Sequence, residues 1–221
     1  MDHAPSLTPE ALHRLLSRRD LTDPLQGRHP IQDLVIDIRR PLARLKLPVR
    51  HAHSGPVRPA REGERPGPKL VAAPIDLLEQ GLLAIADNEE HPVLLCTQGS
   101  VHGLHATCGG QHLHGHLLGL WLLPGASGPA PEAMAEVVRE ALRATLSGAE
   151  YRLLPMTDPC LERAFRIELR HAGDWIGAGL CGRYVHPRAG AVQGVLLELD
   201  ELLALRDAVP ERNDRELSEA G

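Results

Sequence analysis

The sequence has few aromatic residues, with one Phe, two Trp and two Tyr among 221 residues. Modules that bind nucleic acids by stacking on bases need exposed aromatic rings, so this scarcity argues against such a module. It also predicts a core built from Leu, Val, Ile and Ala. The four cysteines include no CxxC pair. They therefore indicate reduced thiols in a cytosolic protein, not a disulfide framework.

Long hydrophobic runs and a secretory signal pattern are also lacking. The longest apolar run, 117–124, is far shorter than the roughly 20 residues that a membrane-spanning helix needs. The N-terminus does not show a basic segment followed by an apolar one. The net charge of -5 argues against a protein whose whole surface coats DNA. We expect a cytoplasmic protein without a membrane partner.

The segment 92–123 carries the highest density of groups able to do chemistry. An apolar run at 92–97 predicts a buried strand, and a return strand begins at Gln111. Residues 112, 114 and 116 are histidines that alternate with Leu113, Gly115 and Leu117. Because a strand places alternate side chains on opposite faces, three imidazoles would share one surface. The pattern predicts a histidine-rich hairpin and, if the protein has a site, places it there.

The rest of the chain predicts an α+β fold. Helical spacing of apolar residues indicates helices from Pro30, over 75–86, from Pro131 and over 196–208. Strand patterns occur at 151–154, 164–169 and 175–181, and their short connections favour antiparallel pairing. We therefore expect a mainly antiparallel sheet of five or six strands with helices packed on one side.

A proline-rich stretch separates two parts of the chain. Residues 48–69 show neither a helical nor a strand period, which predicts a linker or irregular loop. The predicted organisation is an N-terminal helical segment over 1–47, this linker, a core over 70–209 and a disordered tail over 210–221. Basic residues are frequent in 39–69, against only Glu62 and Glu64. This pattern fits either a basic arm for RNA or another polyanion, or a solvated arginine-rich loop.

The histidine-rich hairpin is also a candidate metal site. Imidazole and thiolate are good zinc ligands, and the candidate ligands are His112, His114, His116 and Cys108. The spacing matches no known zinc signature, so polar residues lining a solvated cleft, or a pocket for a non-metal ligand, are the alternatives. Ser100 and Cys108 are nucleophile candidates by proximity only. The sequence identifies no catalytic residue.

Four short blocks occur in order along the chain. The first is Arg-Asp-Leu-Thr-Asp-Pro at 19–24, followed by Gly-Arg-His-Pro-Ile-Gln at 27–32. The second is the hairpin, which returns into Leu-Gly-Leu-Trp at 118–121. The third is Trp-Ile-Gly-Ala-Gly-Leu-Cys-Gly at 175–182, with His186 and Pro187 after it, and the fourth is Leu-Asp-Glu-Leu-Leu-Ala-Leu-Arg-Asp at 199–207. In this order the blocks resemble the catalytic core of class II aminoacyl-tRNA synthetases, above all the phenylalanyl-tRNA synthetase alpha-subunit type and its short stand-alone paralogues.

The departures from the family fall on its ATP chemistry. The arginine expected in the hairpin loop is absent from 102–105, and the arginine of the closing helix is replaced by Glu201. Two glycines that let the backbone approach ATP in the family are replaced here by Leu196 and Glu198. Acidic residues of the family's strand that ends in Cys-Gly are replaced here by Gly177 and Leu180. Losing one arginine–phosphate contact costs on the order of 2–4 kcal/mol of transition-state stabilisation. The resemblance therefore implies a retained fold with a lost reaction.

By resemblance, we expect a synthetase-like protein that binds an amino acid, an adenylate-like molecule or RNA, as a homodimer or as an accessory subunit of a partner enzyme. In that fold the histidine face forms the floor of the active-site cleft. The candidate pocket residues are His102, His105, His112, His114, His116, Trp121, Cys181 and Glu201. ATP or an adenylate is the ligand implied by resemblance, zinc is the metal suggested by the histidines, and tRNA is a possible partner. Two alternatives stay open: an active ATP-dependent ligase with altered residues, and a metal-dependent enzyme.

Overall fold

The structure is a computed structural model, and it describes most of the chain. The described residues are 13, 17–60, 69–71, 73–83, 85, 92–104, 112–124, 131–146, 149–158, 161–187 and 189–208. Residues 1–12 and 14–16 of the expected N-terminal helical segment fall outside these residues, as does the tail over 210–221.

The centre of the fold is one seven-stranded sheet in the order β1-β4-β5-β9-β8-β7-β6. Its strands are β1 (Val49–Ser54), β4 (Val93–Leu104), β5 (His112–Leu123), β6 (Tyr151–Asp158), β7 (Leu161–His171), β8 (Asp174–His186) and β9 (Gly190–Glu198). Only β1 is parallel to its neighbour, β4; the other pairs are antiparallel. A small antiparallel ribbon pairs β2 (Val57–Arg58) with β3 (Lys69–Leu70).

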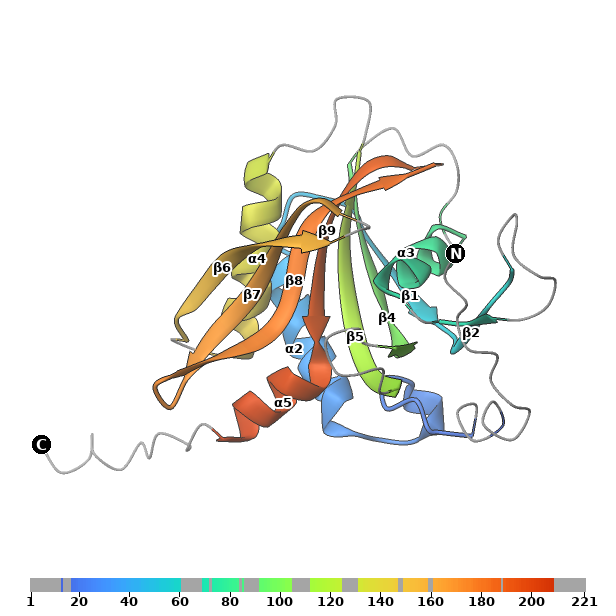
Figure 1. The fold of residues 1–221 in the computed structure, drawn as a ribbon, viewed down its shortest axis with the longest axis horizontal. Coiled ribbons are helices and arrows are strands. Elements are labelled where there is room, and N and C mark those ends of the chain that lie inside the picture. The colour runs from blue at the N-terminus through green and yellow to red at the C-terminus, as the bar shows by residue number, and fades with distance from the viewer. Residues whose placement is uncertain are drawn as a thin grey trace, which may run out of the picture.

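Helices cover both faces of this sheet. On one face, α2 (Pro30–Leu42), α4 (Pro131–Thr145) and α5 (Leu199–Ala208) pack on Leu94, Leu118, Leu120 and Leu197. On the other face, α3 (Pro74–Leu82) packs with Leu95, Trp121 and Leu196. Figure 1 shows the twisted sheet with α3 beside β1 and α5 at the end of β9. The predicted α+β class is confirmed, but the expectation that all helices lie on one side is wrong.

Local contacts explain where the helices begin. The ring nitrogen Nδ1 of His29 accepts a hydrogen bond from the Ile31 amide at 3.3 Å, and Pro30 occupies the first turn of α2. At α3, the Asp76 carboxylate accepts a bond from the Ala73 amide at 2.9 Å. The same carboxylate pairs with the buried Arg58 at 2.8 Å, which ties α3 to β2. Gly81 lets α3 approach the sheet, because a Cβ there would lie 2.9 Å from Leu95 Cδ2.

Two expected elements differ from the structure. Residues 49–54, placed by the sequence pattern in an irregular linker, form edge strand β1. Its polar positions Arg50, His51 and His53 hide any apolar alternation, and its pairing with the buried β4 holds it in the sheet. Residues 196–198, expected to be helical, belong to the central strand β9, and α5 begins only at Leu199. A run of leucines is compatible with a buried strand and with a helix, so periodicity alone does not separate them.

Candidate functional site

His116 is held by a carboxylate from the other end of the chain. Asp200, in the first turn of α5, accepts a bond from the His116 amide at 2.7 Å, and its Oδ1 lies 3.0 Å from the ring Nδ1. The second ring nitrogen, Nε2, accepts a bond from the Leu21 amide at 3.3 Å. Nε2 must therefore carry a lone pair, so in the neutral ring the proton sits on Nδ1 and is donated to Asp200.

The N-terminal turn that contacts His116 is fixed to the sheet by a second histidine. Asp20 accepts bonds from the amide and the hydroxyl of Thr22, at 2.9 and 2.7 Å. His53 Nε2 lies 3.3 Å from Asp20 Oδ2 and 3.2 Å from Thr22 Oγ1. Gln98 on β4 donates to the Thr22 carbonyl at 2.9 Å. We refer to Asp20, Thr22, His53, Gln98, His116 and Asp200 as the histidine network.

The pKa values in this network follow from these contacts. Burial of Asp20 alone would raise its pKa, but hydrogen bonds from His53 and Thr22 hold the pKa of that carboxyl well below its usual range. The hydrogen bond to Asp20 raises the pKa of His53, and partial burial opposes that change. The network cannot work as a catalytic triad, because Asp20 and Thr22 both approach the same nitrogen of His53.

The face of the hairpin that carries His116 is closed at this point. The His116 side chain is only 3 % exposed, beneath the turn at Leu21 and beside α5. The resemblance implied an open cleft floor there. The structure instead uses His116 to join strand, turn and helix.

The other hairpin histidines are only partly described. His102 is buried and lies opposite His114 in the β4–β5 register, while His112 lies opposite Leu104. His105 and Cys108 lie outside the described residues, as do the side chains of His112 and His114. Among the side chains that the structure describes, no three His, Cys, Asp or Glu residues form a group able to hold a metal. Zinc therefore stays a prediction that rests on the histidine pattern.

Trp121 and Cys181 fill the core on opposite faces of the sheet. Trp121 is fully buried, donates to Thr97 Oγ1 at 2.7 Å and packs edge-on against Tyr184, with ring centroids 5.2 Å apart. Cys181 is buried on the face of α2, α4 and α5, and burial raises the pKa of its thiol to about 11. A protonated, buried thiol is a poor nucleophile.

Glu201 lies exposed on the first turn of α5, directly after Asp200. This is the position that the resemblance assigns to a phosphate-binding arginine. Two carboxylates at a helix N-terminus are favoured by the helix dipole, and they oppose the approach of a phosphate to that end of the helix.

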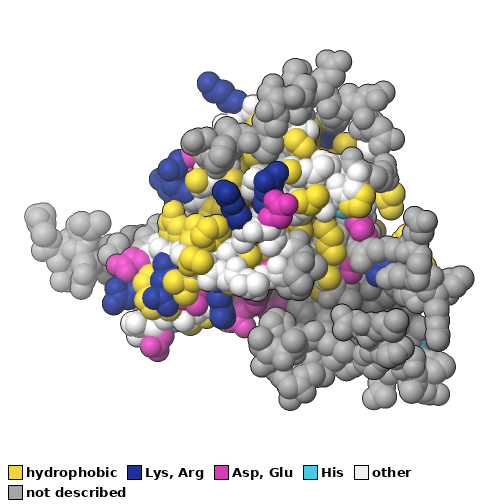
Figure 2. Space-filling model, turned by 45° about the horizontal axis from the view of Figure 1, so that its top comes forward, with side chains coloured by type: hydrophobic (Ala, Val, Ile, Leu, Met, Phe, Trp, Pro, Cys, Tyr) yellow, Lys and Arg dark blue, Asp and Glu magenta, His cyan; other side chains and the backbone are white. Residues whose placement is uncertain are grey.

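Sequence reasoning missed two charged clusters. In the first cluster, the buried Glu168 of β7 pairs with Arg152 Nη2 at 2.7 Å and lies 3.6 Å from Arg166 Nε. The guanidinium of Arg152 also stacks over the Trp175 ring, 4.3 Å from its centroid. The partner Arg152 comes from another strand, β6, so the local pattern of charges on β7 does not reveal this pair. On the same edge, β6 exposes Tyr151, Leu153, Leu154 and Met156. Figure 2 shows one face of the molecule, where hydrophobic side chains alternate with basic and acidic ones.

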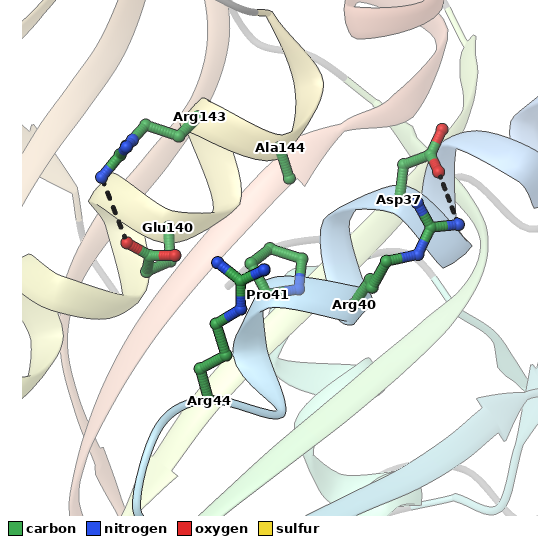
Figure 3. A pocket seen from close by; sticks show the side chains of 7 residues that line it. All are labelled: Asp37, Arg40, Pro41, Arg44, Glu140, Arg143 and Ala144. Carbon is green, nitrogen blue, oxygen red and sulfur yellow. Dashed lines mark ion pairs between the residues drawn. The ribbon is translucent and has the colours of Figure 1, made fainter.

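The second cluster lines an open groove between α2 and α4, with a volume of about 450 Å³. Figure 3 shows its side chains, which are Asp37, Arg40, Pro41, Arg44, Glu140, Arg143 and Ala144. Arg40 pairs with Asp37 at 3.3 Å, and Arg143 pairs with Glu140 at 3.7 Å. The frequency of arginine in 39–50 was the signal for it, but the sequence does not reveal that α4 supplies the opposite wall.

Comparison with known proteins shows the fold. No protein-family model matches the sequence, and neither does any curated protein. Two solved structures of pyrrolysyl-tRNA synthetase from Desulfitobacterium hafniense match it, each at 14% identity over 90% of this chain and 74% of theirs. Their TM-scores are 0.56 and 0.55. The chain therefore has the fold of a class II aminoacyl-tRNA synthetase catalytic core.

Proposed function

We propose that this synthetase-like protein binds an amino-acid-like or adenylate-like molecule and does not carry out ATP-dependent aminoacylation. The observation that carries the proposal is the acidic first turn of α5. Asp200 there is engaged with His116, and Glu201 is exposed beside it.

The residues of this turn do not fit the phosphates of ATP. Amino-acid activation depends on cations that hold the phosphates and stabilise charge as pyrophosphate leaves. An exposed carboxylate at that place repels the same charge, and the neighbouring carboxylate cannot turn away without giving up its bonds to the buried His116. We therefore derive no step that uses ATP, and an active ligase with altered residues is the less favoured alternative.

The finer points of the proposal rest on the sequence resemblance. The phenylalanyl type is the subtype that the four sequence blocks favour, whereas the matching structures are of a pyrrolysyl enzyme. Class II cores usually form dimers, so a homodimer or a complex with a partner enzyme is part of the proposal. RNA remains a candidate partner on the same basis.

A metal-dependent enzyme remains the other alternative. A metal-binding histidine commonly donates its second ring N–H to a carboxylate, and Asp200 plays that part for His116. However, the nitrogen that would face the metal accepts a bond from Leu21. Metal analysis of protein purified without a histidine tag tests this alternative directly, and stoichiometric zinc would favour it.

Thermal-shift measurements test the proposed ligand class. The full chain is screened against the twenty amino acids, non-hydrolysable aminoacyl-adenylate analogues, and ATP with Mg²⁺. We expect at least one amino acid or analogue to raise the melting temperature, because a ligand that binds only the folded state stabilises it. ATP with Mg²⁺ alone should not. A shift with ATP as large as that with the best amino acid, or no shift with any compound, would contradict the proposal.

A further inference from the structure

One arginine of α2 is partly buried and has no partner for its charge. Arg39 Nε is shielded from water without a hydrogen bond, and the side chain forms no ion pair with any residue that the structure describes. By contrast, the next residue, Arg40, is exposed and pairs with Asp37 at 3.3 Å. Burial lowers the pKa of Arg39, but a guanidinium still stays charged at physiological pH. A desolvated cation without a counter-ion is unfavourable, so this position calls for an anion.

The side of α2 that carries Arg39 meets the edge strand β1. His51 of β1 lies opposite Cys96 in the β1–β4 register, and Val49 packs against the same core cluster as Cys96. Alternate residues of a strand share a face, so His51 and His53 lie with Val49 on the face of the sheet that α2 covers. His51 is exposed, which leaves this border between helix and strand open to solvent.

The groups around Arg39 do not neutralise it. Burial lowers the pKa of His51, and the positive charge of Arg39 lowers it further. Burial raises the pKa of the Cys96 thiol to about 12, so this thiol is neutral at physiological pH. The hydrogen bond to Asp20 raises the pKa of His53, whereas burial and the Arg39 charge oppose that rise. Asp20 is therefore the counter-ion of His53, and Arg39 is left with neutral neighbours.

We propose that Arg39 and His51 bind an oxyanion that carries one negative charge, the carboxylate or phosphate group of a small molecule. A guanidinium donates two parallel hydrogen bonds to such a group. The neutral ring of His51 has one N–H that can donate a further bond. One guanidinium balances one negative charge, and the carboxylate of Asp20 beside His53 disfavours more, so a single small anion fits this site better than a polyanion. The site lies at β1 and is separate from the α5 turn on which the proposed function rests.

Thermal unfolding of the full chain in phosphate, in acetate and in chloride, at equal ionic strength and slightly acidic pH, tests this inference. The wild-type melting temperature should rise with phosphate or acetate and reach a plateau. The shift should be about 3–6 °C at a concentration of about ten times the Kd. General stabilisation by an excluded salt increases without a plateau. The anion with the lower Kd shows whether the site prefers a phosphate or a carboxylate.

Arg39→Met separates a binding role from a structural one. In chloride this variant should melt at or above the wild-type temperature, because it removes a desolvated cation. It should lose the saturable shift, so that wild type is the more stable protein only when the anion is present. Arg40→Met is the matched control, since it removes the same charge one residue away and should keep the full shift. His51→Ala should weaken the apparent affinity about two- to tenfold through the loss of one hydrogen bond.

Three results of these melts would overturn the inference. The first is a wild-type protein that shows no saturable shift with either anion. The second is an equal loss of the shift in Arg39→Met and Arg40→Met. The third is an Arg39→Met variant that is destabilised equally in chloride and in phosphate, since the side chain would then act only in the fold. Light scattering adds a fourth: if Arg39→Met dissociates an oligomer, the counter-ion comes from a second copy of the chain. Because the probes are inorganic phosphate and acetate, these outcomes do not depend on whether an amino acid or an adenylate binds near α5.

Discussion

Two charged regions of the molecule differ in how their charges are balanced. In the histidine network, Asp20 is nearly buried and each ionisable group has a partner from a distant part of the chain. In the α2–α4 groove, the two shorter pairs join residues three positions apart on one helix, and Asp37 has a longer contact of 3.9 Å with Arg206 of α5. A buried charge without a partner costs several kcal/mol, whereas water solvates an exposed one. The network therefore maintains the fold, whereas the charges of the groove are balanced by water and by short-range pairs.

The largest effect is expected from removing a buried charge of the histidine network. Asp20→Asn removes the charge that pairs with His53 and weakens the bonds from Thr22. We expect the free energy of unfolding to fall by about 2–3 kcal/mol. This loss is small for a broken buried ion pair, because the His53 side chain is partly exposed. Urea unfolding measures it. Asp37→Asn in the groove is the matched control, and an equal loss in both variants would contradict the distinction.

The bond between Asp200 and His116 should have the next largest effect. Asp200→Ala leaves a buried ring N–H and a backbone amide without this acceptor, so the free energy of unfolding should fall by about 1–3 kcal/mol. Asp200→Asn, whose amide oxygen can still accept one bond, should recover part of that loss. In nitrogen NMR the neutral form of the wild-type His116 ring should carry its proton on Nδ1. A ring protonated at Nε2 would contradict the bond from Leu21.

The pH dependence separates His53 from the rest of the network. Because the folded-state pKa of His53 is raised above 6.5, its contribution is present below that value and is lost as the pH rises through the folded pKa. Because the folded pKa of Asp20 is depressed, its contribution is present above 3.8 and is lost as the pH falls through the folded pKa. His53→Gln should therefore destabilise the protein most between these two values and least at alkaline pH. Unfolding experiments across pH measure the difference in the free energy of unfolding between the wild type and His53→Gln. A difference that stays constant with pH would contradict the ion pair between His53 and Asp20.

The smallest effect is expected in the groove. Arg143→Ala breaks an exposed pair with Glu140 on one helix, which typically contributes under about 0.5 kcal/mol. Urea unfolding should barely distinguish this variant from the wild type. A loss above about 1 kcal/mol would show that the groove arginines, like the histidine network, hold the fold together.

Much of the fold could be predicted from the sequence. The alternation of 164–169, with Phe165, Ile167 and Leu169 facing the helices, is confirmed by β7. Long-range pairing decided the remaining elements. Strand β1 is polar at four of its six positions and pairs with β4 alone. The leucines of β9 have no period that distinguishes a strand from a helix.

Less of the candidate site could be predicted. The histidine pattern singled out His116, but its partners, Leu21 and Asp200, lie 95 and 84 positions away in the sequence. Local spacing does not contain that information. The block at 19–24 was identified from its own residues, whereas its contacts with His53 and Gln98 come from the packing of the sheet.

The chain has the synthetase fold, and we propose that it has lost amino-acid activation. The most direct test is amino-acid-dependent exchange of pyrophosphate into ATP, measured with the purified full chain for each of the twenty amino acids. The account predicts exchange no greater than that of heat-denatured protein, because the first turn of α5 presents carboxylates where the reaction needs a cation. Exchange well above that control with any amino acid would contradict it.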